Sequence, residues 1–358
     1  MKQGRTIADF AAELQRQSAV KKDYLASSDA IQMTVQDENI KLSLDGMQST
    51  FNIMELAHLQ ISEYTGIPYK YYTRMLSNPD LLVHNVNHWL HTEESVQKKR
   101  MVRTLDGSVR AFLSDRYRRI DNAQIAEWVL PIIGQLQDAR IESCEVTDTR
   151  MYIKVVNPRL SRDLSVGDTV QSGIIISNSE VGLGSVLVAP LIYRLVCSNG
   201  MIAEDSRVKK YHIGRVQDSD ENMEVYQDDT LKADDAALML KLRDTVSAVV
   251  SEVVFAKIVD NMRESKNAKI DAVSAVKVVE LTSQAVGIAK TEADGILGHL
   301  IAGGDLSLYG LGNAVTRYAQ DVTSYDRSTE LESIGYKVMT LPSRKWAAIT
   351  SEASKASV

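Results

Sequence analysis

The sequence predicts an α+β protein, in which an N-terminal domain of mixed helices and antiparallel strands is followed by an all-α C-terminal region. Apolar residues alternate in short runs between turn residues over much of residues 31–216, whereas beyond residue 237 they recur at helical spacings of three and four. Residues 217–235 separate the two patterns with eight acidic residues and one lysine, a net of −7, which is typical of a solvated segment. We therefore divide the chain into an N-terminal helix and arm (1–30), an α+β core domain (31–216), an acidic linker (217–236) and a helical C-terminal region (237–358).

The first elements are a helix and a β-hairpin. Residues 1–30 predict one short amphipathic helix followed by a polar segment. Residues 31–44 alternate around the turn at residues 37–39, which predicts two strands. A helix then follows over residues 52–64, and Gly66 ends it.

The next elements are a helix, a hairpin and another helix. Pro79 opens a helix over residues 78–94. Its apolar stripe consists of Leu82, Val86 and Trp89. Residues 97–114 then change to a strand-like period around Asp106-Gly107, a dipeptide that favours a tight hairpin. Asp121 is expected to cap the helix over residues 121–136.

Strands dominate the rest of the core domain, and helices dominate the C-terminal region. Residues 141–214 are mostly β, interrupted by turn signals at Asn157-Pro158, Gly167-Asp168 and Gly182-Leu183-Gly184. The Gly182 turn lies between two strands, so it lacks the strand-to-helix context of a dinucleotide-binding loop. The helices predicted beyond the linker cover residues 238–262, 272–286, 306–322 and 329–338.

Composition and charge narrow the class of protein. The 358 residues include 41 basic and 47 acidic ones, a net charge of −6, which argues against a wholesale polycation but leaves room for a local basic patch. Two cysteines cannot build the disulfide framework of a secreted protein, and the N-terminus lacks the apolar stretch of a signal peptide, so we expect a cytoplasmic location. No apolar run is long enough for a membrane span, and the GxxxxGK[ST], GxSxG and HExxH motifs are absent. We expect no membrane partner and no cofactor.

The strongest chemical signal is a basic segment. Residues 97–119 hold eight basic residues against two acidic ones, a net of +6 in an acidic chain. If Asp106-Gly107 forms a two-residue turn, Arg103 lies opposite Arg110, and such a like-charge pair is destabilising unless an anion binds between the two guanidinium groups. A tyrosine among the neighbouring arginines is the mixture with which single-strand binders attract the backbone and stack on bases. The predicted nucleic-acid-binding residues are Lys98, Lys99, Arg100, Arg103, Arg110, Arg116, Tyr117, Arg118 and Arg119.

Other interpretations of these residues stay open. The basic strands form a solvated face if nearby acidic residues pair with the arginines and Tyr117 packs in the core. Three histidines, at i, i+4 and i+7 of one predicted helix, have a spacing compatible with a transition-metal site, although an exposed polar face is the more ordinary explanation, and we assign no metal. These histidines are His84, His88 and His91. Cys144 and Cys197 lack metal-ligand spacing, and we interpret them as buried thiols.

Several stretches of the sequence are similar to a known family. They are MELAHLQISEYTGIPYKYY, NPDLLVHNVNHWL, VRAFLSDRYRRIDN, SGIIISNSEVGLGS, APLIYRLVCSNGM and YGLGNAVTRYAQD, in this order over roughly residues 54–320. Together they resemble the phage- and plasmid-like proteins grouped as domain of unknown function 932. The resemblance implies a gene of a bacteriophage, plasmid or integrative element, often beside recombination and replication functions, and it supplies no catalytic residue. A looser similarity, in the succession of hairpin and helix, points to phage single-strand annealing proteins.

These observations predict a non-enzymatic, cytoplasmic protein of a mobile element that binds single-stranded DNA, forms a homo-oligomer and assists annealing or recombination. Recombination or replication proteins are the partners that this function implies. Two alternatives remain. One is an interaction or assembly factor that recruits partners through its helical C-terminal region, and the other is an enzyme with a cryptic metal site at the three histidines.

Overall fold

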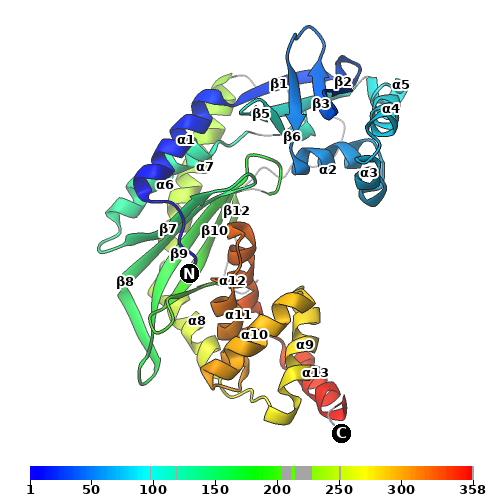
Figure 1. The fold of residues 1–358 in the computed structure, drawn as a ribbon. Coiled ribbons are helices and arrows are strands. Elements are labelled where there is room, and N and C mark those ends of the chain that lie inside the picture. Colours follow the sequence, from blue (N-terminus) through cyan, green and yellow to red (C-terminus); the bar gives the residue numbers. More distant parts are fainter. Residues whose placement is uncertain are drawn as a thin grey trace.

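Two β-sheets and a region of helices make up the protein (Figure 1). The computed structural model describes residues 1–96, 98–117, 119–184, 186–203, 211–213, 228–249 and 251–356. The first sheet has the strand order β1-β5-β6-β4-β3-β2 and is antiparallel except for the β4–β6 pair. Its strands are β1 (Lys22–Ser27), β2 (Ile31–Gln36), β3 (Asn39–Leu44), β4 (Thr50–Ile53), β5 (Lys99–Leu105) and β6 (Ser108–Ser114). The predicted α+β class with an all-α C-terminal region is confirmed.

Helices cover one face of the first sheet and protect its edge. They are α2 (Glu55–Tyr64), α3 (Tyr69–Met75), α4 (Pro79–Leu90) and α5 (Glu93–Val96), and with the sheet they form the N-terminal unit. Leu82 and Val86 of α4 lie in the core beneath the sheet. Asn87 forms two 2.8 Å hydrogen bonds with the backbone of Met33, one to its N–H and one to its carbonyl. Because Met33 lies on the edge strand β2, these bonds satisfy backbone groups that would otherwise be free to pair with another strand.

A partly buried histidine makes the stability of the N-terminal unit depend on pH. The Nδ1 atom of His58 on α2 lies 2.8 Å from the hydroxyl of Tyr72, and burial lowers the pKa of His58 from 6.5 to about 4. The folded state therefore binds a proton less readily than the unfolded state, so stability falls as the pH drops from 6.5 towards 4. Between pH 7 and pH 5 we expect the wild type to lose about 2 kcal/mol more unfolding free energy than His58→Gln, measured by urea titration. His84→Gln, at an exposed position, is the control, and equal losses in all three proteins would contradict this assignment.

Two tight turns of the first sheet have the backbone conformation of two-residue hairpins. Asp37 and Glu38 join β2 to β3, and Asp106 and Gly107 join β5 to β6. All four residues have positive φ, from 50° to 73°, as the two-residue hairpins with a type I′ turn require. The predicted hairpins at both places are confirmed.

The second sheet is antiparallel and lies at the centre of the molecule, with helices on both faces (Figure 1). Its main path is β11-β10-β9-β8-β7, and β12 pairs with β10. Its strands are β7 (Arg140–Val146), β8 (Met151–Ser165), β9 (Asp168–Asn178), β10 (Val186–Arg194), β11 (Asn199–Ile202) and β12 (Tyr211–Ile213). On one face lie α1 (Ile7–Val20), α6 (Asn122–Gln135) and α7 (Asp228–Val249), which share a hydrophobic core with the sheet.

The remaining helices lie beyond the other face of the second sheet. They are α8 (Glu252–Ser265), α9 (Ala275–Val286), α10 (Lys290–Gly303), α11 (Leu308–Tyr318), α12 (Tyr325–Met339) and α13 (Ser343–Ala356). Of these, α8, α11 and α12 contact the sheet, and α9, α10 and α13 pack on α11 and α12. Helix α12 lies against the sheet, and its Glu332 forms a buried ion pair with Lys154 of β8. Glycines let α11 and α12 approach closely, since a Cβ atom at Gly312 would lie 2.7 Å from the carbonyl oxygen of Gly335. The helical region is therefore docked on the sheet rather than held away from it.

Several predicted elements differ from the structure. Residues 22–27, predicted as a polar segment, form β1, and the single helix predicted over residues 238–262 is divided into α7 and α8. Asn157-Pro158 does not end a strand but lies inside β8, next to a shift in register. Trp89 is 47% exposed, and Leu90 takes its predicted place in the core, because the buried stripe follows residues 82, 86 and 90.

The predicted acidic linker, residues 217–236, lies partly outside the described residues. The part from residue 228 onward belongs to α7, so the helices begin before the predicted boundary at residue 237. Further along α7, Leu238, Leu242 and Val246 are buried in the core of the second sheet. Helix α7 therefore packs on the second sheet as part of its hydrophobic core and does not act as a linker there.

Candidate functional site

A β-bulge changes the position of the two arginines at the centre of the predicted interface. In the hairpin of β5 and β6, Thr104 pairs with Val109 but Arg103 pairs with Ala111, so Arg110 is an extra residue. The predicted pairing of Arg103 with Arg110 is therefore wrong. Both side chains are buried, with exposed fractions of 0% for Arg103 and 5% for Arg110.

Carboxylates of the protein itself neutralise these arginines. The side chain of Arg103 donates to Asp23 of β1 over 2.8 Å and to Asp121 over 3.1 Å, and also to the carbonyl oxygen of Glu180 over 2.7 Å. Arg110 donates to the carboxylate of Glu180, which is 3% exposed. The repulsion that we expected an external phosphate to relieve is thus relieved internally. We call Asp23, Arg103, Arg110, Asp121 and Glu180, together with Lys21, the ion cluster.

The ion cluster connects the N-terminal unit to the second sheet. Glu180 follows β9, and its Oε1 atom accepts hydrogen bonds from Lys21 over 3.1 Å and from the backbone N–H of Asn122 over 2.6 Å. Asp121 occupies the N-cap position of α6 as predicted, but its side chain forms no capping hydrogen bond with the helix. Burial raises the pKa of Asp121, but the hydrogen bond and charge of Lys21 and the charge of Arg103 outweigh burial and hold that pKa below its usual value. The carboxylate of Asp121 is therefore charged and pairs with Lys21 and Arg103 of the ion cluster.

Two further predicted contact residues also face inward. The Tyr117 hydroxyl donates to the carbonyl oxygen of Ser179 over 3.0 Å, and its ring packs against a small apolar cluster that includes Leu113. The guanidinium group of Arg100 lies 4.3 Å from the ring centre of Tyr64 and 5.0 Å from that of Phe112. Tyr117 therefore packs in the core, as the alternative interpretation expected, and its ring is not open to stack on a base.

The other basic residues lie at the surface. Lys98, Lys99, Arg116 and Arg119 are exposed, whereas Arg118 lies outside the described residues. Arg119 is 3.4 Å from Asp23. Of the eight predicted residues that the structure describes, four lie on the surface, mostly at the end of the hairpin opposite its turn, and the central pair is buried.

The histidines of α4 do not form a metal site in the described part of the chain. His84, His88 and His91 are exposed, and Nε2 of His91 lies 2.9 Å from the carbonyl oxygen of Ile31. No group of three histidine, cysteine or acidic residues that could hold a metal ion occurs among the residues that the structure describes.

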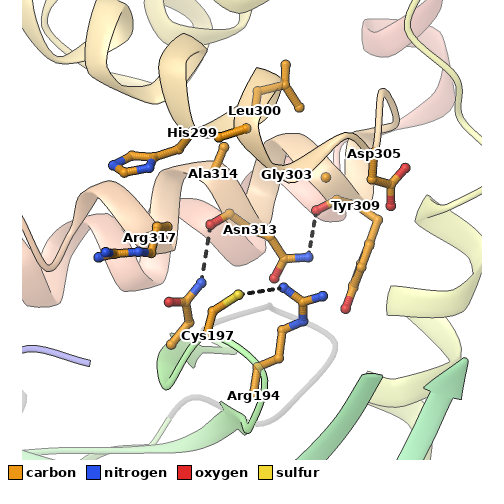
Figure 2. Close-up of a pocket in the computed structure, with 13 residues that line it drawn as sticks. Arg194, Cys197, His299, Leu300, Gly303, Asp305, Tyr309, Asn313, Ala314 and Arg317 are labelled. Atoms are coloured by element: carbon orange, nitrogen blue, oxygen red, sulfur yellow. Dashed lines mark hydrogen bonds between the residues drawn. The ribbon is translucent and has the colours of Figure 1, made fainter. Parts of the chain in front are cut away.

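A second site, which the sequence analysis missed, is a cleft of about 250 Å³ (Figure 2). Its floor is the turn between β10 and β11, with Arg194, Cys197 and Asn199, and its roof is formed by α10 and α11, with Asn313 and Arg317. The floor comes from APLIYRLVCSNGM and the α11 part of the roof from YGLGNAVTRYAQD, two of the stretches that resemble the family, whereas α10 lies outside them. The signal in the sequence that could have pointed to the cleft is that both stretches resemble the same family.

Charged side chains at the cleft form hydrogen bonds with neighbouring residues of the protein. Arg194 donates to Asp168 over 2.6 Å and to the sulfur of Cys197 over 3.3 Å. Burial raises the pKa of Asp168, but the hydrogen bonds from Arg194 and Tyr309 outweigh it, so that pKa lies below its usual value. Cys197 is half-buried and Cys144 is buried, and neither forms a disulfide.

Comparison with known protein families identifies the family of this chain. Residues 110–334, more than half of the chain, match the family described as Domain of unknown function (DUF932). The chain belongs to the DUF932 family. No curated protein and no solved structure matches it. Among the described residues, no helix is both long and apolar enough to span a membrane.

The extent of the DUF932 match separates the two candidate sites. The match begins at Arg110, so Lys98 and the strand β5, with Lys99 and Arg103, lie outside it. Every residue that lines the cleft, from Arg194 to Arg317, lies inside it. The cleft is therefore a feature of the matched region, whereas the match begins inside the basic hairpin, in the middle of the first sheet.

Proposed function

We propose that this DUF932 protein binds single-stranded DNA and, as a homo-oligomer encoded by a phage or plasmid, assists annealing or recombination in the cytoplasm. The proposal rests on one observation, an exposed group of cations at the end of the hairpin opposite its turn. Similarity to phage single-strand annealing proteins and contact with recombination or replication proteins belong to the same proposal.

The fold of the hairpin brings these cations together from two strands. β5 begins at Lys99 and β6 ends at Ser114, and Arg100 pairs with Ser114. Residues 98 and 99 therefore lie beside the turn that carries Arg116. The side chains of Lys99 and Arg116 have no ion-pair partner among the residues that the structure describes, so both charges are available to phosphate groups.

An exposed aromatic ring lies on the same unit. Trp89, at the C-terminal end of α4, is 47% exposed, and the chain runs from it through α5 to Lys98. The carbonyl oxygen of Lys98 accepts a hydrogen bond from the backbone N–H of Ser28, which holds this end of β5 against the end of β1. An exposed indole ring on the same unit as Lys99 and Arg116 would add base stacking to phosphate attraction, the two contributions that single-strand binding without sequence preference needs. Trp89 thus replaces Tyr117 as the proposed stacking residue.

Reversing two charges tests the proposed interface. For the double variant Lys99→Glu/Arg116→Glu we expect at least a tenfold loss of affinity for a labelled single-stranded oligonucleotide at low salt, because about two phosphate contacts are lost. The slope of log K against log salt should also fall by about 1.4, at about 0.7 per contact. Fluorescence anisotropy, with the same sequence as a duplex for comparison, measures both quantities.

Lys70→Glu/Arg74→Glu is the matched control, since it makes the same charge change at exposed positions of α3. We expect it to retain most of the affinity. Equal losses in the two double variants would show a general effect of net charge and overturn the assignment to the hairpin. A wild-type protein that does not bind single strands at low salt would overturn the proposed function itself.

A further inference from the structure

A crevice of about 280 Å³ lies where the N-terminal unit meets the second sheet. One wall belongs to the N-terminal unit, with Met54 before α2, Leu59 of α2 and Tyr69 of α3. The other wall is the turn between β7 and β8, with Asp148 and Thr149. Sites for small molecules occur preferentially at such interfaces between units, where apolar walls surround a few polar groups.

The walls of the crevice are held in place by the protein itself. The hydroxyl of Thr149 donates to Asp326 of α12 over 2.5 Å, and its carbonyl oxygen accepts a hydrogen bond from the hydroxyl of Ser179 over 3.0 Å. On the opposite wall, the ring of Tyr69 stacks on that of Tyr72, with 6.2 Å between the ring centres. The crevice is therefore formed before any ligand enters it.

A β-bulge brings a buried guanidinium group to this crevice. Arg110 is the extra residue of the bulge in the hairpin of β5 and β6, and bulges redirect side chains next to functional sites. The side chain is 5% exposed and lines the crevice. Its Nη2 atom pairs with Glu180, whereas Nη1 has no hydrogen-bond partner among the described residues and, unlike Nε, is not fully enclosed. Nη1 is therefore a free donor for an acceptor atom of a ligand.

The charges of the lining residues disfavour an anionic ligand. Glu180 already neutralises the charge of Arg110. Glu55 and Asp148, which also line the crevice, are exposed and have no ion-pair partner in the described part of the chain. A phosphate or carboxylate group at the mouth would be repelled by these two carboxylates, whereas an N–H group would find acceptors there. The crevice is thus suited to a neutral ligand that carries both acceptors and donors.

We propose that this crevice binds a free nucleoside through its purine or pyrimidine base. A ring nitrogen or carbonyl oxygen of the base accepts a hydrogen bond from Nη1 of Arg110, and the planar ring packs against Tyr69 and Leu59. An amine or ring N–H of the base donates to a carboxylate at the mouth. The volume of about 280 Å³ is just below the range of roughly 300–1,000 Å³ typical of drug-sized ligands, which favours a single nucleoside over a longer molecule. This site does not depend on the proposed binding of DNA.

Titration of the full-length protein with adenosine, guanosine, cytidine and uridine tests the site. Saturation-transfer NMR detects binding, and calorimetry measures the affinity. We expect at least one nucleoside to bind saturably, and we expect its 5′-monophosphate to bind at least about tenfold more weakly because of the carboxylates at the mouth.

Two variants test the residues that hold the base. Tyr69→Leu removes the ring but keeps an apolar side chain, and Arg110→Lys keeps a positive charge for Glu180 but loses the free Nη1 donor. We expect each to weaken the binding of the nucleoside by about tenfold or more. Tyr71→Leu and Arg74→Lys make the same changes at exposed positions of α3 and should leave the affinity unchanged. Circular dichroism checks that each variant is folded, and Tyr69→Leu decides the matter if Arg110→Lys is not.

Selectivity tests the carboxylates at the mouth. In the double variant Glu55→Gln/Asp148→Asn, the preference for the nucleoside over its monophosphate should fall from about tenfold to about twofold or less. Glu63→Gln/Asp80→Asn makes the same charge change at exposed positions of α2 and α4 and should retain the preference. Equal loss of the preference in both double variants would show an effect of net charge and overturn the role of Glu55 and Asp148.

The remaining outcomes decide the class of ligand. Absence of saturable binding by all four nucleosides, or binding that neither Tyr69→Leu nor Arg110→Lys weakens, would overturn the proposal. Equal or tighter binding of the monophosphate to the wild type would show an anion site instead. Equal or tighter binding of indole, which lacks an acceptor, would show a merely apolar cavity, and the same result with phenylethylamine would show a cation site.

Discussion

Replacing Glu332 with glutamine is expected to lower the free energy of unfolding by about 3–5 kcal/mol, since it leaves a charged lysine buried without its partner. Lys154 of β8 and Glu332 of α12 are both 0% exposed, and Nζ of Lys154 lies 2.7 Å from Oε2 of Glu332. Nζ also donates to Thr329 over 3.0 Å and lies 4.7 Å from the ring centre of Tyr325. The pair is a fully buried charged contact between the second sheet and the helical region, so its loss should loosen their packing.

The pH dependence of this variant separates charge burial from lost packing. Burial lowers the pKa of Lys154, and the charge of Glu332 opposes that effect. Without Glu332 the pKa of the lysine falls further below its unfolded value, so the unfolded state binds more protons and stability rises with pH. In urea titrations, the deficit of Glu332→Gln relative to the wild type should therefore shrink from pH 7 to pH 9.

Two further variants complete the comparison. Lys154→Met/Glu332→Leu removes both charges and should recover most of the stability that the single change loses. Glu330→Gln, which breaks the exposed 2.6 Å pair with Arg327 on the same helix, should change the free energy of unfolding by less than about 1 kcal/mol. A loss of similar size in Glu330→Gln, or a double variant less stable than Glu332→Gln, would contradict the role assigned to the buried pair.

The parts of the fold that the sequence predicted well depend on local chemistry. Asp106-Gly107 specifies a hairpin because both residues readily adopt positive φ, whereas at Asp37-Glu38 only the aspartate does. Strand β1 was missed because Lys22–Ser27 lacks a buried alternation, and it pairs with β5, which lies more than 70 residues away. A strand that is stabilised by so distant a partner need not show an alternating apolar pattern in its own sequence.

The sequence predicted the cluster of basic residues at the candidate interface, but not the strand register or the ion-pair partners of the arginines. The bulge at Arg110 shifts the register that a simple turn implies, and the carboxylates that neutralise Arg103 and Arg110 come from β1 and from the end of β9. Spacing within the hairpin contains no information about Glu180, some 70 residues away. The cleft was missed for the same reason, since its floor and roof are joined only in the folded chain.

Replacing Glu180 with glutamine is expected to cost about 3–5 kcal/mol of unfolding free energy, because it removes the carboxylate that neutralises buried Arg110 and also holds Lys21 and Asn122. Glu280→Gln is the control, since it breaks an exposed i,i+3 pair with Lys277 and should cost less than about 1 kcal/mol. Urea unfolding measures both. Hydrogen exchange should show the largest loss of protection in β5, β6 and the start of α6, where the N-terminal unit meets the second sheet.

The same variant distinguishes a structural cluster from a hidden phosphate site. If Arg103 and Arg110 served DNA in the folded protein, removing the competing carboxylate would free them, and Glu180→Gln would bind single strands more tightly with its stability unchanged. The burial of both arginines predicts the opposite, a destabilised protein whose single-strand affinity, measured where it remains folded, matches the wild type. It also predicts that Arg103→Glu or Arg110→Glu acts on folding, because a carboxylate there would face Asp23 or Glu180 in a buried site. A stable Glu180→Gln with higher affinity would place the phosphate contacts back in the ion cluster and away from Lys99 and Arg116.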